Sequence, residues 1–219
     1  MWGDEGEVTQ NRKKFLESLY VPTDNCAMLS LVHGADIVYV SKKDTHSSLE
    51  RKTIANADAM MTAEKGIYFL MLTADCLPIL FYDPMQSVIS LAHCGWKSTD
   101  QHLASKVVRE MGKVYGCDPA NIIVGIGPGI HKESYIFENC VQKTMPSWKP
   151  FLTDLPNGKT AVDIVEYNKQ QLQDEGIAEG NIEIMDINTA KSPDFFSHYC
   201  ATWEGQVEAR FLTVLGMRE

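Results

Sequence analysis

The 219-residue sequence contains no uninterrupted apolar run of 18 or more residues, so we expect no membrane span. Its first residues, "MWGDEGEVTQ", lack a basic region followed by an apolar stretch, so we expect no signal peptide. The six cysteines form no C-x-x-C pair, and without a secretion signal free thiols are the default. These absences favour a cytoplasmic protein without a disulfide framework.

The sequence is also poor in basic residues, with a formal net charge of −9. This balance argues against a general nucleic-acid binder, which would carry a basic face, but it allows a small anionic substrate held by one or two lysines. No repeat, low-complexity tract or Pro/Gly/Ser-rich linker divides the chain, so we expect residues 1–219 to form a single domain. The acidic composition favours a soluble monomer.

Three apolar runs dominate the middle of the chain, at residues 66–72, 77–82 and 87–92. Strands this apolar are buried on both faces, so the sheet must be covered by helices or by another sheet. With hairpin-like neighbours and amphipathic helices elsewhere, the pattern predicts an α+β fold with mixed sheets. An N-terminal helix over residues 11–20 is expected to place on one face Phe15, Leu16 and Leu19.

The clearest helix follows the third apolar run. Its apolar stripe consists of Leu103, Val107, Val108, Met111, Val114 and Tyr115. Ser98 and Gln101 fit a capping box at its start, and Gly116 fits its end. We therefore expect "HCGW" at a strand-to-helix junction, where free N–H groups and the helix dipole favour an anion.

Three residues with metal-binding side chains each end an apolar run: His33, Cys76 and His93. Strand ends that converge at one sheet edge commonly build sites. One thiolate and two imidazoles suit Zn²⁺ and leave a fourth position open for water or substrate, although the same donors also suit copper. Because the three are far apart in the sequence, the alternative that each packs separately in the core stays open.

Four neighbours of these residues have functional or structural readings. Asp75 could orient a ligand histidine, act as an acid or base, or simply form an Asx-turn. Trp96 could stack on a planar base or fill the core, and Lys97 could contact phosphate or be solvated. Cys94 should point to the opposite face of the strand from His93, which favours a structural role.

The segment "GIGPGI" at residues 125–130 resembles a dinucleotide-binding loop only superficially. Ile130 stands at its sixth position and Pro128 interrupts it, so the Rossmann fingerprint is not met. A tight turn at the edge of the site is the better interpretation.

An ordered set of segments covers nearly the whole chain: "GDEGEVTQNRKKFLESL", "LVHGADIVYV", "NADAMMT", "LTADCLPILFYDP", "AHCGWKS", "GIGPGIHKESYIFE", and "DFFSHY" with Arg210. In this order and spacing the sequence resembles the laccase-domain (YfiH-like) family. Members of that family are labelled multicopper polyphenol oxidoreductases and are also described as zinc-dependent purine nucleoside phosphorylases.

The resemblance implies an α/β/β/α layered sandwich with mixed β-sheets, a fold shared with toxin deamidases that use a Cys–His pair. It also implies that His33, Cys76 and His93 are the metal ligands. Some positions depart from the family pattern: Cys94 replaces Ala, and Lys97 replaces Arg, which turns a bidentate contact into a point charge. The family's N-terminal strand and loop are expected to be absent or reduced to "MWGD".

The function implied by the resemblance is a zinc-dependent purine nucleoside phosphorylase with adenosine deaminase activity, acting on adenosine, inosine or methylthioadenosine. The expected catalytic residues are His33, Cys76, His93 and Asp75. Lys97 and Trp96 are the expected contacts for phosphate and substrate.

Three alternatives stay open. A copper-dependent polyphenol oxidase follows from the family label, but six histidines without any His-x-His pair are too few for a four-copper laccase. A metal-free Cys–His hydrolase or deamidase would use Cys76 as nucleophile and His93 as base, and would give His33 no required role. A purely structural metal domain is disfavoured by the open coordination position.

Overall fold

The computed structural model describes residues 5–50 and 52–219, so the segment "MWGD" lies outside the described residues. The helices are α1 (Glu5–Ser18), α2 (Trp96–Asp100), α3 (Leu103–Tyr115), α4 (Ile164–Asp174) and α5 (His198–Glu204). The strands of the first half are β1 (Cys26–Met28), β2 (Ile37–Tyr39), β3 (Ala59–Thr62), β4 (Tyr68–Thr73), β5 (Leu77–Asp83) and β6 (Val88–Cys94). Those of the second half are β7 (Ile123–Ile126), β8 (Ile136–Phe137), β9 (Leu152–Asp154), β10 (Thr160–Val162), β11 (Ile182–Ile184) and β12 (Phe211–Gly216).

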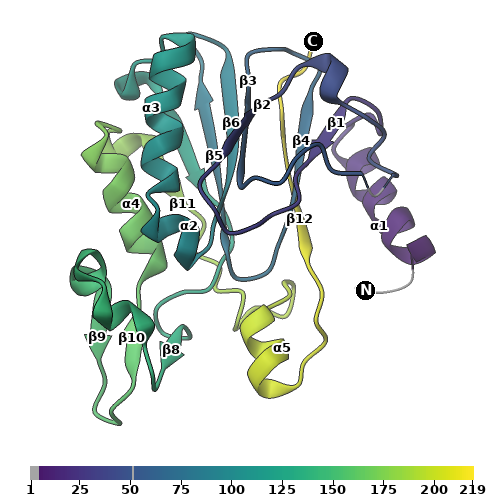
Figure 1. The fold of residues 1–219 in the computed structure, drawn as a ribbon. Helices are drawn as coiled ribbons and strands as arrows, with labels where there is room; N and C mark the ends of the chain where they lie inside the picture. The colour runs from purple at the N-terminus through teal and green to yellow at the C-terminus, as the bar shows by residue number, and fades with distance from the viewer. Residues whose placement is uncertain (1–4, 51) are drawn as a thin grey trace.

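The elements form four layers (Figure 1). Helices α2, α3 and α4 cover one face of a six-stranded sheet of order β11-β7-β5-β6-β3-β2. A three-stranded sheet of order β1-β4-β12 covers the other face, and α1 packs on its outer side. Parallel and antiparallel pairs occur in both sheets. The predicted α/β/β/α arrangement with mixed sheets is confirmed.

Each interface between layers has its own apolar core. In β6 the side chains alternate, so that Val88 and Ala92 face the helices whereas Ile89 and Leu91 face the second sheet. In β4 the same alternation sends Phe69 between the two sheets. A smaller core between β4 and α1 includes Leu16, Met28 and Leu70. This is why the three predicted runs, now β4, β5 and β6, are apolar at nearly every position.

The expected N-terminal helix forms, but only part of its expected apolar face is buried. Leu16 is fully buried, whereas Phe15 is 40% exposed and Leu19, beyond the end of α1, is 38% exposed. The buried face instead includes Arg12, which donates a hydrogen bond to the carbonyl of Ser48. Phe15 and Leu16 lie on the helix as expected, but Leu19 lies beyond its end and the face is only partly buried.

The capping box predicted for the long helix is also wrong. The chain enters the five-residue helix α2 from Gly95, and the Ser98 hydroxyl has no hydrogen-bond partner among the described residues. His102 then adopts a left-handed conformation (φ 58°), so α3 begins only at Leu103. Of the predicted stripe on α3, Leu103, Val107, Val108 and Met111 are buried, whereas Val114 is exposed and Tyr115 is half-buried. The predicted end at Gly116 is confirmed. The helix that begins within the "HCGW" segment is therefore the short α2 and not the long α3.

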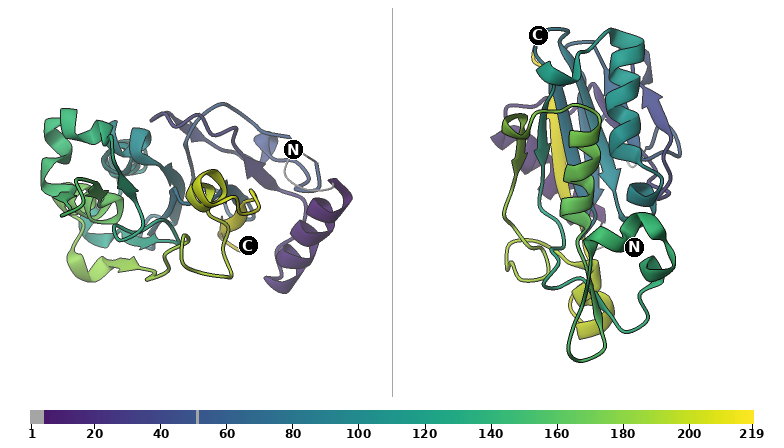
Figure 2. Two further views of the ribbon diagram at one scale, coloured as in Figure 1. Left: turned by 90° about the horizontal axis from the view of Figure 1, so that it is seen from below. Right: turned by 90° about the vertical axis from the view of Figure 1, so that its left-hand side faces the viewer.

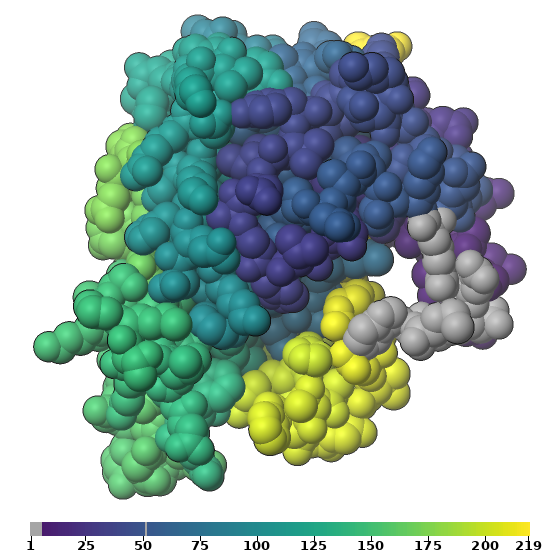
Figure 3. Space-filling view, in the orientation of Figure 1, coloured from purple at the N-terminus to yellow at the C-terminus, as the bar shows by residue number. Residues whose placement is uncertain are grey.

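A small sheet of order β8-β10-β9 and helix α5 extend beyond one end of the main sheets (Figures 1 and 2). They lie against each other, since Tyr199 Oη donates to the carbonyl of Ile136 at 3.0 Å. In the space-filling view the α5 segment abuts the segment that carries β8 (Figure 3). All six cysteines are free thiols, as predicted. None of the helices within the described residues has the length and apolarity needed to cross a membrane.

Candidate metal centre

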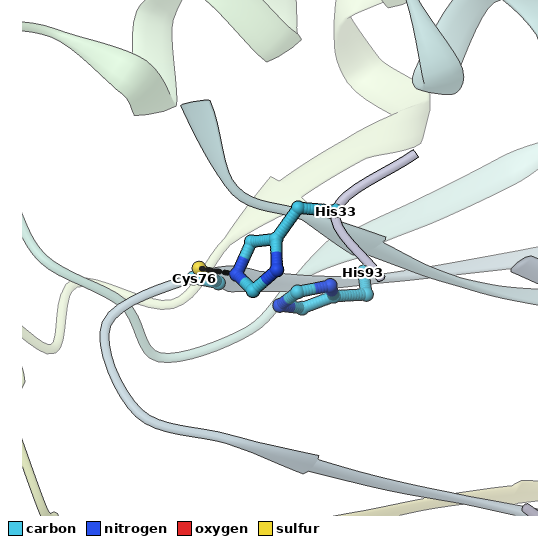
Figure 4. A group of neighbouring side chains, drawn as sticks. All are labelled: His33, Cys76 and His93. Atoms are coloured by element: carbon cyan, nitrogen blue, oxygen red, sulfur yellow. Dashed lines mark hydrogen bonds between the residues drawn. The ribbon is translucent and has the colours of Figure 1, made fainter. Parts of the chain in front are cut away.

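The structure brings His33, Cys76 and His93 together (Figure 4). Their donor atoms all lie within 4.8 Å of one another, and Cys76 Sγ is 3.9 Å from His33 Nε2. His33 belongs to the loop after β1, Cys76 to the turn between β4 and β5, and His93 to β6. Within residues 5–50 and 52–219 this is the one such group of three or more His, Cys, Asp or Glu side chains.

The centre is buried on one side and open on the other. His93 is 3% exposed, whereas Cys76 is half-buried and His33 is exposed. A ligand held by the three side chains is therefore anchored in the protein but reachable from solvent. Among metal sites, an open position is typical of catalytic sites, whereas structural sites are closed.

Gly95 makes room for the centre. A Cβ atom at this position would lie 2.7 Å from Cys76 Sγ and 3.1 Å from His33 Cδ2. The glycine that follows the His-Cys pair is thus a close-approach residue, and its missing side chain lets two of the three donors converge.

Asp58 is the residue that the sequence interpretation missed. Its carboxylate is fully buried and accepts a hydrogen bond from His93 Nδ1 at 2.8 Å. It also accepts backbone bonds from His33 N at 2.9 Å and Gly34 N at 2.6 Å. A signal was present, because an aspartate that opens the buried strand "AMMT" must find partners or remain unpaired in the core.

The carboxylate, imidazole and thiol form an electrostatic chain. Burial disfavours the Cys76 thiolate, but the charge on His93 and hydrogen bonds from His33 and His93 outweigh it and lower the pKa of Cys76 to about 6. Burial also disfavours the His93 imidazolium, but Cys76 and Asp58 outweigh it and raise the pKa of His93 to about 9. Burial opposes ionisation of Asp58 as well, yet the bonds from His93 and Gly34 keep its pKa below the usual range.

Of the readings of Asp75, an orienting contact with a ligand histidine does not fit its hydrogen bonds. Its carboxylate accepts hydrogen bonds from Thr189 Oγ1 at 2.6 Å, Ser197 Oγ at 3.1 Å and the backbone N of Tyr199 at 2.6 Å. Asp75 is buried and has a left-handed backbone (φ 78°). It therefore ties the cysteine turn to the C-terminal segment that leads into α5.

The Gly-Pro-Gly segment lies at the edge of the site, as predicted, but Gly129 pairs with Asn188 in an isolated bridge and the segment forms no tight turn. Ile130 N donates to the carbonyl of Asp75 at 2.9 Å. A Cβ at Gly129 would lie 2.3 Å from Leu77 Cδ2 and 2.9 Å from the Asp75 carbonyl oxygen. No side chain fits there without displacing the backbone next to Cys76.

The remaining neighbours occupy three different environments. Cys94 is fully buried in the core between the helices and the six-stranded sheet, on the opposite side of β6 from His93, and burial raises its pKa. Trp96 is half-buried against the same core. Lys97 is exposed, and its ammonium group lies 5.6 Å from the centre of the Trp96 ring.

Comparison with known proteins identifies the family. The family described as multi-copper polyphenol oxidoreductase laccase matches residues 2–217. The chain belongs to this family. Two curated relatives are proteins named purine nucleoside phosphorylase YlmD. The Geobacillus stearothermophilus protein is 30% identical over 224 residues (99% of this chain, 81% of that protein), and the Bacillus subtilis protein is 27% identical over 222 residues (98% and 79%).

The fold of this laccase-like chain agrees with a solved relative. The crystal structure of YlmD from Geobacillus stearothermophilus superposes with a TM-score of 0.90 at 28% identity, covering 99% of this chain and 82% of that one. The resemblance on which the expected fold rested is therefore confirmed. The name of the family and the names of its relatives describe different chemistries, a copper oxidase and a phosphorylase.

Proposed function

We propose that this laccase-like protein is a purine nucleoside phosphorylase that uses a zinc ion held by His33, Cys76 and His93. The observation that carries the proposal is the convergence of these three donors at a solvent-accessible position in a chain whose relatives are named purine nucleoside phosphorylases. In the reaction a phosphate oxygen forms a bond to C1′ of the ribose. The C1′–N9 bond breaks, and the purine leaves with the electron pair and takes up a proton.

The residues fit a zinc ion. Two imidazoles and one thiolate form a three-ligand set that leaves one position open. The lowered pKa of Cys76 provides the thiolate. Asp58 accepts a hydrogen bond from His93 Nδ1, which leaves Nε2 as the metal-binding atom. When bound, Zn²⁺ supplies a Lewis acid that polarises an oxygen of substrate or water.

The neighbouring side chains have supporting roles in this proposal. Lys97, on the helix that directly follows the site, would supply a point charge for phosphate. Trp96, on the same helix, packs against the core between the helices and the six-stranded sheet. Asp75 acts through the turn that it holds, because its carboxylate is already engaged by Thr189, Ser197 and Tyr199.

Adenosine deamination is a second reaction that we propose for the same centre. A water oxygen bonds to C6 of the purine while the C6–N6 bond breaks and ammonia leaves. Both reactions need the same access from solvent, and the exposed side of His33 supports that access. Inosine, the product of deamination, is in turn a substrate for phosphorolysis.

Copper oxidation of phenols fits the donor set less well. A four-copper laccase needs a trinuclear cluster and a blue-copper centre, which together require many more imidazoles than the two in this group. The six histidines of the sequence include no His-x-His pair. A single copper ion in place of zinc is the form of this alternative that the residues allow.

One observation favours a metal-free alternative. Cys76, His93 and Asp58 follow one another as thiolate, imidazole and orienting carboxylate, which is the order of a nucleophilic triad. In such a hydrolase or deamidase His33 would be dispensable. A His33→Ala variant that keeps full activity without metal would therefore favour the triad over the metal site.

The proposed function is tested by product analysis. Purified protein is incubated with inosine or adenosine, with and without phosphate, and the products are separated by chromatography. Phosphate-dependent formation of hypoxanthine or adenine supports phosphorolysis, and phosphate-independent formation of inosine from adenosine supports deamination. Absence of all three products would sink the proposal.

A matched pair of variants assigns the activity to the site. Cys76→Ala should abolish the activity. Cys117→Ala should not, because this buried cysteine lies next to Asp83, at the end of β5 that is opposite to Cys76. Activity that survives Cys76→Ala would show that the proposed site is the wrong one.

A further inference from the structure

One buried carboxylate serves both histidines of the metal centre. Asp58 Oδ1 accepts from His33 N at 2.9 Å and from His93 Nδ1 at 2.8 Å. Its Oδ2 accepts from Gly34 N at 2.6 Å and from Val32 N at 3.3 Å. Asp58 itself has no exposed surface, so these four donors replace water for it entirely.

The strand register brings Asp58 to His93. Strand β3 pairs antiparallel with β6, with Ala59 opposite Ala92. Asp58, the residue before β3, therefore lies beside His93 near the end of β6. His93 N donates to the Asp58 carbonyl at 2.7 Å, which fixes the backbones together. The imidazole then has an acceptor at Nδ1, and Nε2 remains for a metal.

The same carboxylate holds the loop that carries His33. His33 has a positive φ of 59°, which is unfavourable for a residue other than glycine. Three consecutive backbone N–H groups, from Val32 to Gly34, converge on Asp58 in the manner of an anion nest. The carboxylate thus stabilises the conformation that aims the exposed imidazole at Cys76.

We infer that Asp58 is a positioning residue that fixes two of the three metal ligands at once, His93 through its ring and His33 through its backbone. The inference rests on the metal site of the proposed function. It explains why His33 and His93, from separate parts of the chain, meet at one place. It also explains why Nε2 of His93 is the nitrogen left for the metal. Asp58 touches neither the metal position nor substrate in this account.

An asparagine at position 58 cannot perform this role, although it has the same shape. It has one acceptor oxygen and one NH₂ group, whereas the donors lie on both sides of the group. If the oxygen faces His33 N and His93, the NH₂ group faces Gly34 N. If it is turned round, the NH₂ group faces His93 Nδ1. In the first orientation the loop that carries His33 loses the bonds from Val32 N and Gly34 N, and in the second His93 loses its acceptor at Nδ1.

The test is the zinc affinity of the purified, metal-stripped protein, measured by competition with a chromogenic chelator. Asp58→Asn should bind Zn²⁺ about 10- to 100-fold more weakly than the wild type. The matched control is Asp83→Asn, which alters another fully buried aspartate with backbone donors, from Met85 and Gln86, at the opposite end of β5 from Cys76. It should bind zinc as the wild type does. Equal affinity of Asp58→Asn and wild type would overturn the inference.

A second measurement does not depend on the variant being folded. In the zinc-loaded wild type, ¹⁵N chemical shifts of the histidine rings should show His93 protonated at Nδ1 and metal-bound at Nε2. The opposite tautomer would overturn the inference. Neither measurement uses a nucleoside, so a missing phosphorylase activity would sink the proposed function alone, whereas a wild type that binds no zinc would overturn both.

Discussion

At the scale of single residues, the lowered pKa of the Cys76 thiol depends on its two histidine neighbours. Four of the other five cysteines have pKa values raised chiefly by burial: Cys26, Cys94, Cys117 and Cys200. Cys76 is desolvated too, but the charge and hydrogen bonds of the two histidines reverse the direction. The thiol chosen from the sequence as a ligand is thus the one whose surroundings favour a thiolate.

A pH titration of the metal-free protein should reveal this thiolate. Absorbance near 240 nm should rise by one thiolate as the pH increases through about 6, since the pKa of Cys76 is lowered to about that value. The Cys76→Ala variant should lack the step, and Cys117→Ala should keep it. A first step only near the ordinary cysteine pKa of about 8.5 would contradict the account.

Gly95 offers a steric test of the same site. Gly95→Ala places a methyl group 2.7 Å from Cys76 Sγ and 3.1 Å from His33 Cδ2. We expect zinc affinity to fall by at least about tenfold, because one donor must move. The control is Gly180→Ala, whose new Cβ would meet nothing within 4 Å. Chelator competition measures both, and unchanged affinity of Gly95→Ala would contradict the proposed packing.

At the scale of elements, Asp75 links the cysteine turn to the segment before α5. Its buried carboxylate accepts hydrogen bonds from Thr189, Ser197 and Tyr199. Asp75→Asn turns an NH₂ group toward at least one of them and should cost about 1 to 3 kcal/mol in the free energy of unfolding. Urea denaturation measures this cost.

The control for this element is Asp163→Asn. Asp163 caps α4 by accepting from Glu166 N, and asparagine caps a helix about as well as aspartate. Its stability should change by less than about 0.5 kcal/mol. If Asp75→Asn is no more destabilising than this control, the link between the turn and α5 is not stabilising.

The elements also show where sequence patterns succeed. Strands β4, β5 and β6 follow directly from their apolar runs, because burial on both faces leaves few other arrangements. The break between α2 and α3 could not be predicted, since it depends on the left-handed His102, and histidine has no strong preference for that conformation. The polar positions near Ser98 therefore suggested a cap that the chain does not form.

At the scale of the whole molecule, the three residues that converge could be predicted, but the carboxylate that supports them could not. Their positions at the ends of apolar runs and the family resemblance indicated His33, Cys76 and His93. Asp58 reaches them through the register of β3 with β6 and a loop from another layer, which are tertiary relations. An orienting role was one of the readings of Asp75, which is adjacent to Cys76 in the sequence. The carboxylate that contacts His93 is instead Asp58, which is distant in the sequence.

The layered core provides a test of the whole fold. Phe69 is fully buried between the two sheets, so Phe69→Ala should destabilise the protein by about 3 to 5 kcal/mol. Phe15→Ala, at a 40% exposed position on α1, should cost far less. Thermal or urea unfolding of both variants measures the difference, and similar costs would contradict the assignment of the central core.

The central claim is that one metal ion is held by His33, Cys76 and His93 together. Elemental analysis of the purified protein tests it most directly, with the wild type compared with single alanine variants of the three residues. The account predicts about one zinc ion per chain in the wild type and a strong loss of zinc in each of the three variants. A wild type without bound metal, or a Cys76→Ala variant that retains its full metal content, would contradict it.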